Sequence, residues 1–356
     1  MMRRHDIDWI RTIVLFLLII YHAFASFMPF APDIRFPIND GFLVDYWFLM
    51  ELINIWRIPI LFVISGMGVY FAIQNRSLLK IIKDRVQRIL VPYFFGCIVL
   101  CPLAFLLVVE FYDNYINGIF HPFYYYIGAS IHLWFLLNIY VYFQILVFLF
   151  FYFKNNPDNF FFKFLRKILS FRFGIYIFMI PIVLEAFLIN PEWYSMYAKT
   201  FHGWVLGFIC FFTGFILVAL KQHFWESIQK IRIFALIIAV VLYLNRISQV
   251  EFEYKNVLIA VESFNWMLVV FAFSARYLNK ASKRLSYLSA AVYPVYILHM
   301  PLQFAFSFLI FPLEIPPFLK LLLMVVLILF SSLFLYEFLI KRIFFLRPLF
   351  GLKFKK

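Results

Sequence analysis

The chain has 356 residues, of which 65% are hydrophobic and 14% charged, against about 45–50% and about 25% in soluble domains. Its mean hydropathy is +0.91, and a globule this apolar has too few polar groups to cover its surface. This composition excludes a soluble enzyme and a disordered chain, and it predicts a polytopic membrane protein. The net charge of +14 would indicate nucleic acid in a soluble chain, but in a membrane protein it reflects basic cytoplasmic loops.

Ten segments are apolar enough to be membrane spans, since a transmembrane helix needs about 20 apolar residues. They are 9–28, 46–73, 90–112, 132–153, 173–190, 201–220, 233–250, 256–277, 287–311 and 318–340. The two alternating sets of connectors and tails carry 25 and 4 Lys and Arg residues, which places the richer set, and both termini, in the cytoplasm. The predicted fold class is therefore all-α, a polytopic transmembrane helical bundle of about ten spans.

An alternative interpretation of the first span is a cleavable signal peptide. Arg3 and Arg4 precede an apolar run, and Ala23-Phe24-Ala25 has the small-x-small pattern of a cleavage site. Cleavage would leave nine spans and break the charge alternation, so a retained first span is favoured.

Polar residues interrupt the first span at three positions. Asp8 and Arg11 stand near its start, and His22 follows Arg11 by eleven positions. Eleven residues make about three helical turns, so Arg11 and His22 share one face about 16 Å apart. Charged groups at membrane depth pair or line a wet cavity, although snorkelling of Arg11 and simple packing of His22 remain alternatives.

The second span carries Glu51, Asn54 and Arg57, followed by Pro59. Asn54 and Arg57 share a helix face, and Pro59 frees backbone groups for a local distortion. Arg57 is interpreted either as a partner of Glu51 in an internal ion pair or as part of a polar cavity.

A basic connector follows at 76–92 and contains Arg85 and Arg88. Anchoring to anionic lipid is the ordinary role of such a loop, and an anion site at the inner face is the alternative, because Arg suits phosphates.

The later spans carry further candidates. His132 and His202 stand at the start of the fourth and sixth spans. Each is a candidate interfacial anchor, and this interpretation is favoured for His202. Glu262 lies in the eighth span, and Tyr293, Tyr296 and His299 lie on one side of the ninth. The three cysteines, in apolar stretches without zinc-ligand spacing, are interpreted as packing residues: Cys97, Cys101 and Cys210.

The chain has no Gly-rich nucleotide loop, metal-ligand cluster or nucleophile elbow. A histidine with several arginines, and no Ser or Cys nucleophile, indicates acid–base chemistry on a phosphate-bearing substrate. A transporter or flippase for an anionic or glycan substrate is the alternative, against which the chain shows no inverted repeat.

Five motifs, in order, resemble those of the acyltransferase 3 family of integral membrane acyltransferases. They are Asp8-x-x-Arg11-(ten residues)-His22, the run from Trp56 to Gly66, Arg85-x-x-Arg88-x-x-x-Pro92-Tyr93, His132-Leu133-Trp134-Phe135-Leu136, and the run from Tyr293 to Pro301. The tail from Arg347 to Lys353 is similar to the branch that includes glucan biosynthesis protein C. The resemblance extends from residue 3 to 353 and implies a single membrane domain over 1–356, without an appended soluble domain.

The resemblance also implies a multi-pass enzyme of the bacterial inner membrane. It would move an acyl group from cytoplasmic acyl-CoA to a hydroxyl of an extracytoplasmic glycan. Acetyl-CoA or succinyl-CoA would be the co-substrate, with no permanently bound cofactor or metal and no nucleic acid. His22 matches the catalytic histidine, assisted by Arg11 and Asp8, while Arg11, Arg85 and Arg88 match the CoA side. The substrate-side candidates are Arg57, His132, Glu262 and His299.

Overall fold

The computed structural model describes residues 4–106, 130–248 and 254–354. Throughout these ranges the chain is helical or irregular, without a β-strand. In chain order the elements are α1 (His5–Ala25), η1 (Pro32–Ile34), η2 (Val44–Tyr46), α2 (Phe48–Ile73), α3 (Leu78–Arg85), η3 (Val86–Leu90), α4 (Val91–Phe95), η4 (Gly96–Leu100), α5 (Cys101–Leu106), α8 (Trp134–Asn155), α9 (Phe160–Ser170), η5 (Gly174–Phe178), α10 (Ile180–Ile189), α11 (Phe201–Ala219), α12 (Gln222–Ile247), α13 (Lys255–Tyr277), α14 (Lys283–Ile310), α15 (Pro317–Leu335), η6 (Tyr336–Ile340) and α16 (Leu346–Leu349).

The chain divides into two compact units. Unit 1 comprises Met1–Val14, Glu51–Ile82 and Asn138–Ser286, and unit 2 comprises Leu15–Met50, Lys83–Leu137 and Tyr287–Lys356. Each unit is described by itself below.

Nine helices in the described ranges are long and apolar enough to cross a membrane. They correspond to nine of the ten predicted spans and confirm a polytopic helical membrane bundle. The predicted span 173–190 is instead the short 3-10 segment η5 followed by α10. Two spans begin more than ten residues earlier than predicted, at Leu78 and at Gln222, because the Lys and Arg residues in the N-terminal parts of these helices resemble connectors. Residues 107–112 of the third predicted span, and most of the connector 113–131, lie outside the described residues.

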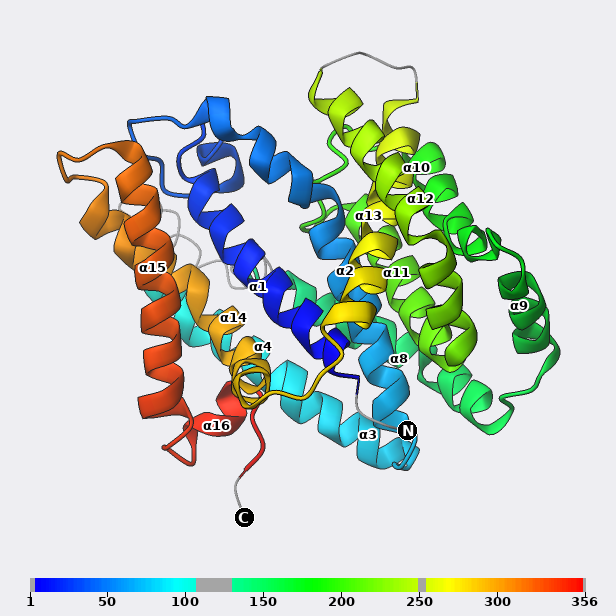
Figure 1. Ribbon diagram of the computed structural model, residues 1–356. Helices are drawn as coiled ribbons and strands as arrows, with labels where there is room; N and C mark the ends of the chain where they lie inside the picture. The colour runs from blue at the N-terminus through cyan, green and yellow to red at the C-terminus, as the bar shows by residue number, and fades with distance from the viewer. Residues whose placement is uncertain (1–3, 107–129, 249–253, 355–356) are drawn as a thin grey trace. The chain divides into compact units, whose positions relative to one another are not determined.

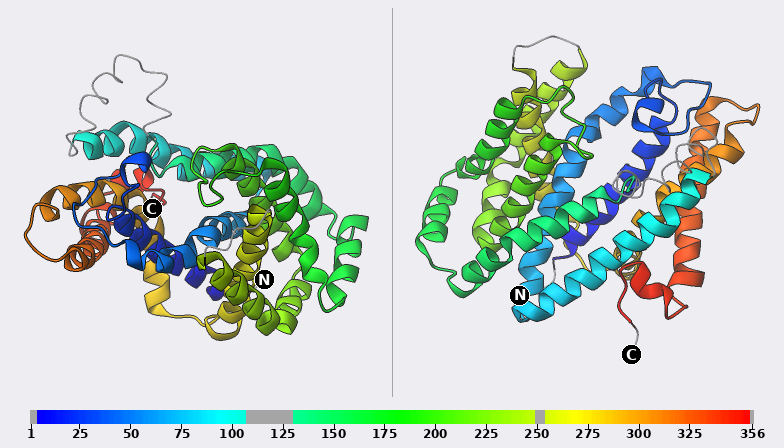
Figure 2. Two further views of the ribbon diagram at one scale, coloured as in Figure 1. Left: turned by 90° about the horizontal axis from the view of Figure 1, so that it is seen from above. Right: turned by 180° about the vertical axis from the view of Figure 1, so that it is seen from behind.

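Close packing in unit 1 depends on glycines between α2 and α11. A Cβ atom on Gly66 would lie 1.9 Å from the carbonyl oxygen of Phe211, and one on Gly214 would lie 1.9 Å from that of Val63. Small residues allow transmembrane helices to approach this closely. The helices α12 and α13 also lie side by side (Figures 1 and 2), and Nε2 of Gln229 donates to the carbonyl of Ala272 between them.

The proline of α2 creates a second contact in unit 1. Pro59 has no N–H group, so the carbonyl of Ile55, four residues earlier, loses its helical donor. The hydroxyls of Tyr197 and Ser263 donate to this oxygen at 2.7 and 2.9 Å. The carbonyl that Pro59 leaves without a helical donor therefore joins three segments, because a carbonyl in an apolar bundle must find a donor.

In unit 2, residues 26–47 fold back on the end of α1. The amides of Asn39 and Leu43 donate to the carbonyls of Ser26 and Phe27. The buried Lys320 donates through Nζ to Oδ1 of Asn39 at 3.2 Å and to the carbonyl of Phe311 at 2.6 Å. These bonds hold the segment after α1 against α15.

All three cysteines are buried thiols outside any disulfide bond, which agrees with their prediction as packing residues.

Candidate active site

The side chains of His22 and His299 meet in unit 2. Nδ1 of His22, on the last turn of α1, lies 3.1 Å from Nε2 of His299 in α14. The two rings are nearly coplanar, with an interplanar angle of 9° and centroids 5.3 Å apart. His299 is completely buried, whereas His22 is half-buried. A half-buried histidine next to a buried one has the access and the partner that a proton-transfer group needs.

A third histidine adjoins this pair. The ring of His132 packs edge-on against His299, with centroids 4.7 Å apart, and against Tyr296, with centroids 5.2 Å apart. The hydroxyl of Tyr296 donates to the carbonyl of His132. His132 precedes the span that begins at Trp134. Burial and the nearby His299 lower the pKa of His132 well below its ordinary value. His132 is therefore a neutral ring near physiological pH.

Three histidines in contact suggest a metal site, but their arrangement does not support one. No group of three or more His, Cys, Asp or Glu side chains in the ranges that the structure describes is arranged to hold a metal ion. The ring of His299 is instead engaged by hydrogen bonds through both nitrogens, to His22 and to the carbonyl of Tyr296. The cluster is better suited to moving protons.

The backbone at His22 is also held by α14. Nε2 of Gln303 donates to the carbonyl of His22 at 2.8 Å and lies 3.2 Å from the hydroxyl of Ser26. Gln303 follows His299 by four residues, so both lie on one face of α14. Phe36, from the segment after α1, packs edge-on against the ring of His22, with centroids 5.5 Å apart. His22 is thus held by its ring and by its backbone.

Two of the predicted donor-side arginines lie at a helix irregularity in unit 2. Arg85 ends α3, and Arg88 lies in the π-helical turn η3; both side chains are half-buried. The guanidinium of Arg85 lies close enough to the hydroxyl of Tyr293 in α14 to interact with it electrostatically. The helix α14 therefore carries both Tyr293, which lies near Arg85, and His299, which contacts His22.

The third predicted arginine belongs to unit 1. Nη2 of Arg11 lies 3.0 Å from Oδ1 of Asp8, one turn earlier in α1. Arg11 and Asp8 are therefore grouped with each other, while the histidine cluster is formed within unit 2.

The remaining substrate-side candidates also lie in unit 1. Both carboxylate oxygens of the buried Glu262 bind Arg246, at 2.8 and 3.0 Å. Glu51 also pairs with Arg246, at 3.5 Å, a partner that the sequence analysis did not consider. Arg57 is buried in α2. Within unit 2 the structure brings together His22, His132 and His299, while Glu262 and Arg57 belong to unit 1.

Comparison with protein families matches residues 4–337 to the family Acyl_transf_3, an acyltransferase domain. The chain belongs to this acyltransferase family. Searches of curated proteins and of solved structures return no match. The family, together with the nine apolar helices of the described residues, makes the protein a multi-pass membrane acyltransferase, which favours the enzyme over the transporter that the sequence left open. The similarity to the glucan biosynthesis protein C branch stays a prediction.

Unit 1 of the acyltransferase contains a buried polar pair that sequence reasoning missed. Nδ1 of His202 lies 2.7 Å from Oε1 of Glu185, and Nε2 lies 2.9 Å from the carbonyl of Tyr194. Both side chains are buried, so interpretation of His202 as an interfacial anchor is wrong. The signal in the sequence was Glu185, a carboxylate within an apolar segment. Burial also raises the pKa of Tyr194 well above its ordinary value.

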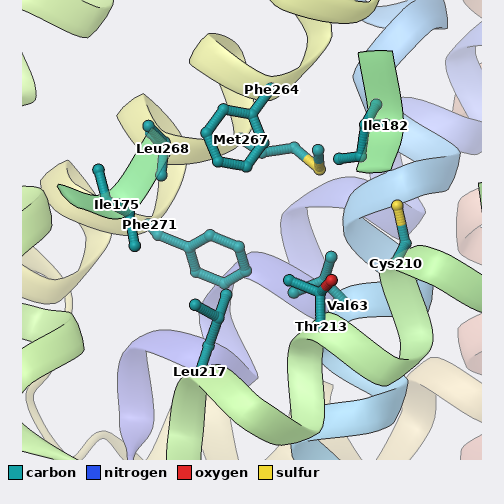
Figure 3. A pocket seen from close by; sticks show the side chains of 10 residues that line it. All are labelled: Val63, Ile175, Ile182, Cys210, Thr213, Leu217, Phe264, Met267, Leu268 and Phe271. Atoms are coloured by element: carbon teal, nitrogen blue, oxygen red, sulfur yellow. The ribbon is translucent and has the colours of Figure 1, made fainter. Parts of the chain in front are cut away.

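An apolar pocket of the acyltransferase lies in unit 1, and Figure 3 shows its lining. Val63, Ile175 and Phe264 are among the side chains around it, and Thr213 and Cys210 supply a hydroxyl and a thiol. No histidine or carboxylate lines it among the described residues. We therefore assign no acid–base chemistry to this pocket and place the candidate active site at the histidine cluster.

Proposed function

We propose that this acyltransferase moves an acyl group from cytoplasmic acyl-CoA to a hydroxyl of an extracytoplasmic glycan or polysaccharide, across a bacterial inner membrane. His22 acts as the general base. The observation that carries the proposal is the 3.1 Å contact between His22 and His299 in a chain of an acyltransferase family. A half-buried imidazole with a hydrogen-bonded partner is the kind of group that removes a proton from a hydroxyl near neutral pH.

The chemical step needs no covalent intermediate on the protein. The neutral imidazole of His22 takes the proton of the acceptor hydroxyl as its oxygen attacks the thioester carbonyl. The tetrahedral oxyanion collapses, the carbon–sulfur bond breaks, and the imidazolium returns its proton to the CoA thiolate. The products are an ester and CoA-SH, and His22 is neutral again. General acid–base catalysis of this kind contributes about 10²–10⁴-fold to a rate.

The donor would be held by arginine at the inner face. Arg85 and Arg88 belong to a segment that the charge distribution predicts to be cytoplasmic, and guanidinium groups bind phosphate oxygens in a bidentate manner. Their location in the same unit as His22 supports a donor that enters from this side. Arg11, which is paired with Asp8 in unit 1, is also proposed to bind the donor.

The acceptor would enter from the opposite side. His22 stands at the end of α1, which the predicted orientation places toward the outer face. His132 offers a neutral ring next to the pair, so it is proposed as a contact for the acceptor hydroxyl or the thioester carbonyl. Acetyl and succinyl both remain proposed acyl groups.

The direct test uses purified protein in lipid nanodiscs with radiolabelled acetyl-CoA and succinyl-CoA. We expect release of CoA thiol with one donor in the presence of acceptor glycan, and loss of at least about 100-fold in His22→Ala. The matched control is His223→Ala, which removes an exposed histidine of α12 and should leave the rate unchanged. Equal rates in wild type and His22→Ala would overturn the role of His22.

A second test uses the native host and scores alkali-labile esters on surface and periplasmic glycans. Gene deletion should remove one ester species, the wild-type gene should restore it, and His22→Ala at matched membrane levels should not. The lost species identifies the acyl group and the acceptor. If deletion changes no ester and the purified protein releases no CoA, the proposed reaction is wrong.

A further inference from the structure

The contact between His22 and His299 is a hydrogen bond and not a face-to-face stack. Lone pairs and N–H bonds of imidazole lie in the ring plane, so an N–N hydrogen bond requires the rings to meet edge to edge. The 9° interplanar angle shows that the ring planes are parallel, as both an edge-to-edge contact and a stack allow, so the distances decide. The 5.3 Å between centroids exceeds the 3.1 Å between nitrogens by nearly the two ring radii, so the nitrogens point at each other.

The carbonyl of Tyr296 decides where the protons are. Nδ1 of His299 lies 2.6 Å from this oxygen, and a carbonyl only accepts hydrogen bonds, so Nδ1 carries a proton. His299 is completely buried, where a neutral ring costs less than an imidazolium. Its Nε2 is then an acceptor, and Nδ1 of His22 must donate to it. The lone pair of His22 is left on Nε2.

We propose that His299 is a positioning residue for the catalytic base: it holds His22 in the tautomer whose Nε2 accepts the proton of the acceptor hydroxyl. This inference rests on the proposed function and reassigns His299, which sequence predicted to bind the acceptor. After proton transfer the bond persists, because Nδ1–H of His22 still faces the lone pair of His299 and the positive charge is shared with a polarised acceptor.

The surroundings keep this geometry. Gln303, one turn beyond His299, binds the carbonyl of His22, so one face of α14 holds both the ring and the backbone of the base. His132 and Tyr296 also pack against the ring of His299, with centroids 4.7 and 5.8 Å away. A histidine that only filled space would need none of these directed bonds, and Phe or Leu would fill the volume without a buried polar cost.

Three variants test the positioning role. His299→Met fills most of the volume but cannot direct the ring of His22, so we expect kcat to fall about 10²–10³-fold with KM for acyl-CoA changed less than about twofold. His299→Gln offers an amide oxygen to Nδ1–H of His22 and should recover at least about tenfold of that loss. Met300→Leu, at the fully buried neighbour, is the packing control and should retain wild-type kcat.

A double-mutant cycle separates this inference from the proposed function. Because His299 acts through His22, adding His299→Met to His22→Ala should cost nothing further. If His22→Ala abolishes activity but His299→Met retains wild-type kcat, the positioning role is wrong and the proposed function stands. If His299→Gln is as inactive as His299→Met while both unfold at the wild-type temperature, the hydrogen bond is also refuted. Activity retained in His22→Ala refutes the proposed base itself.

Discussion

Glu185 and His202 form a buried pair in which each ring nitrogen of the imidazole faces an acceptor oxygen. The carbonyl of Tyr194 binds Nε2, so that nitrogen carries a proton, and a second proton lies between Nδ1 and Glu185 Oε1 at 2.7 Å. The pair as a whole is neutral, whichever partner holds the shared proton. We infer that it joins α10 to the start of α11 without leaving a net charge in the bundle.

The first prediction follows from this pair. Glu185→Ala leaves the buried ring of His202 without its carboxylate partner. Removing one member of a buried pair lowers the free energy of unfolding by about 3–5 kcal/mol. The double variant Glu185→Leu with His202→Leu should lose less, because no orphaned polar group remains. Unfolding of the purified protein in detergent, followed by tryptophan fluorescence, measures both. A single variant as stable as wild type would contradict the prediction.

The second prediction concerns the glycines of α2. Gly66→Ala places a Cβ atom 1.9 Å from the carbonyl of Phe211, whereas a Cβ on Gly68 meets nothing within 4 Å. Gly66→Ala should therefore force α2 away from α11 and destabilise unit 1 by more than about 1 kcal/mol. Gly68→Ala, the control in the same helix, should be neutral or slightly stabilising, since Ala is the better helix former. Thermal unfolding compares the two, and equal melting temperatures would argue against this close approach.

The third prediction concerns acid sensitivity. The pKa of His132 is lowered in the folded protein, so the unfolded chain binds its proton first. Its contribution to stability is complete above the unfolded pKa of about 6.5 and is lost as pH falls from there toward the folded pKa. The melting temperature should drop between pH 7.5 and 5, and His132→Gln should reduce this slope. An unchanged slope in the variant would show that other groups govern acid unfolding.

The fourth prediction concerns the donor. Arg85→Gln removes a guanidinium proposed to bind CoA phosphate, and a charge-assisted hydrogen bond is worth about 1.5–3 kcal/mol. KM for acyl-CoA should rise at least about tenfold, with a smaller change in KM for the acceptor. Lys80→Gln, at an exposed position of the same helix α3, is the control for loss of one positive charge. A rise as large in Lys80→Gln would indicate general attraction of the anionic donor by the basic segment.

The fifth prediction concerns Glu262, a substrate-side candidate whose two oxygens bind Arg246. If this ion pair is structural, Glu262→Gln lowers the melting temperature and leaves KM for the acceptor unchanged. If Glu262 also contacts the acceptor, KM rises at a temperature well below unfolding. Kinetics at low temperature, together with a melting curve, distinguish these outcomes, and we expect the first.

Local pattern was sufficient for most of the bundle. A membrane span can be predicted from the length of an apolar segment, because a helix that crosses a membrane makes its backbone hydrogen bonds within itself. Its prediction therefore needs no knowledge of the helices that pack against it. The starts of the spans at Leu78 and Gln222 were harder to predict, since basic residues are compatible with both a connector and the N-terminal part of a membrane helix. The segment 173–190 was the exception, where 3-10 turns precede the short helix α10.

The sequence by itself determined the membrane class, the helical fold and the residues with polar groups at membrane depth, because composition and periodicity are properties of neighbouring residues. It identified His22, His132 and His299 separately, and it placed Asp8 and Arg11 near the start of the same span. It had no means to bring His22 to His299, which are 277 positions apart, or Glu51 and Glu262 to Arg246. Those pairings depend on which helix faces pack together, and only the tertiary structure decides that.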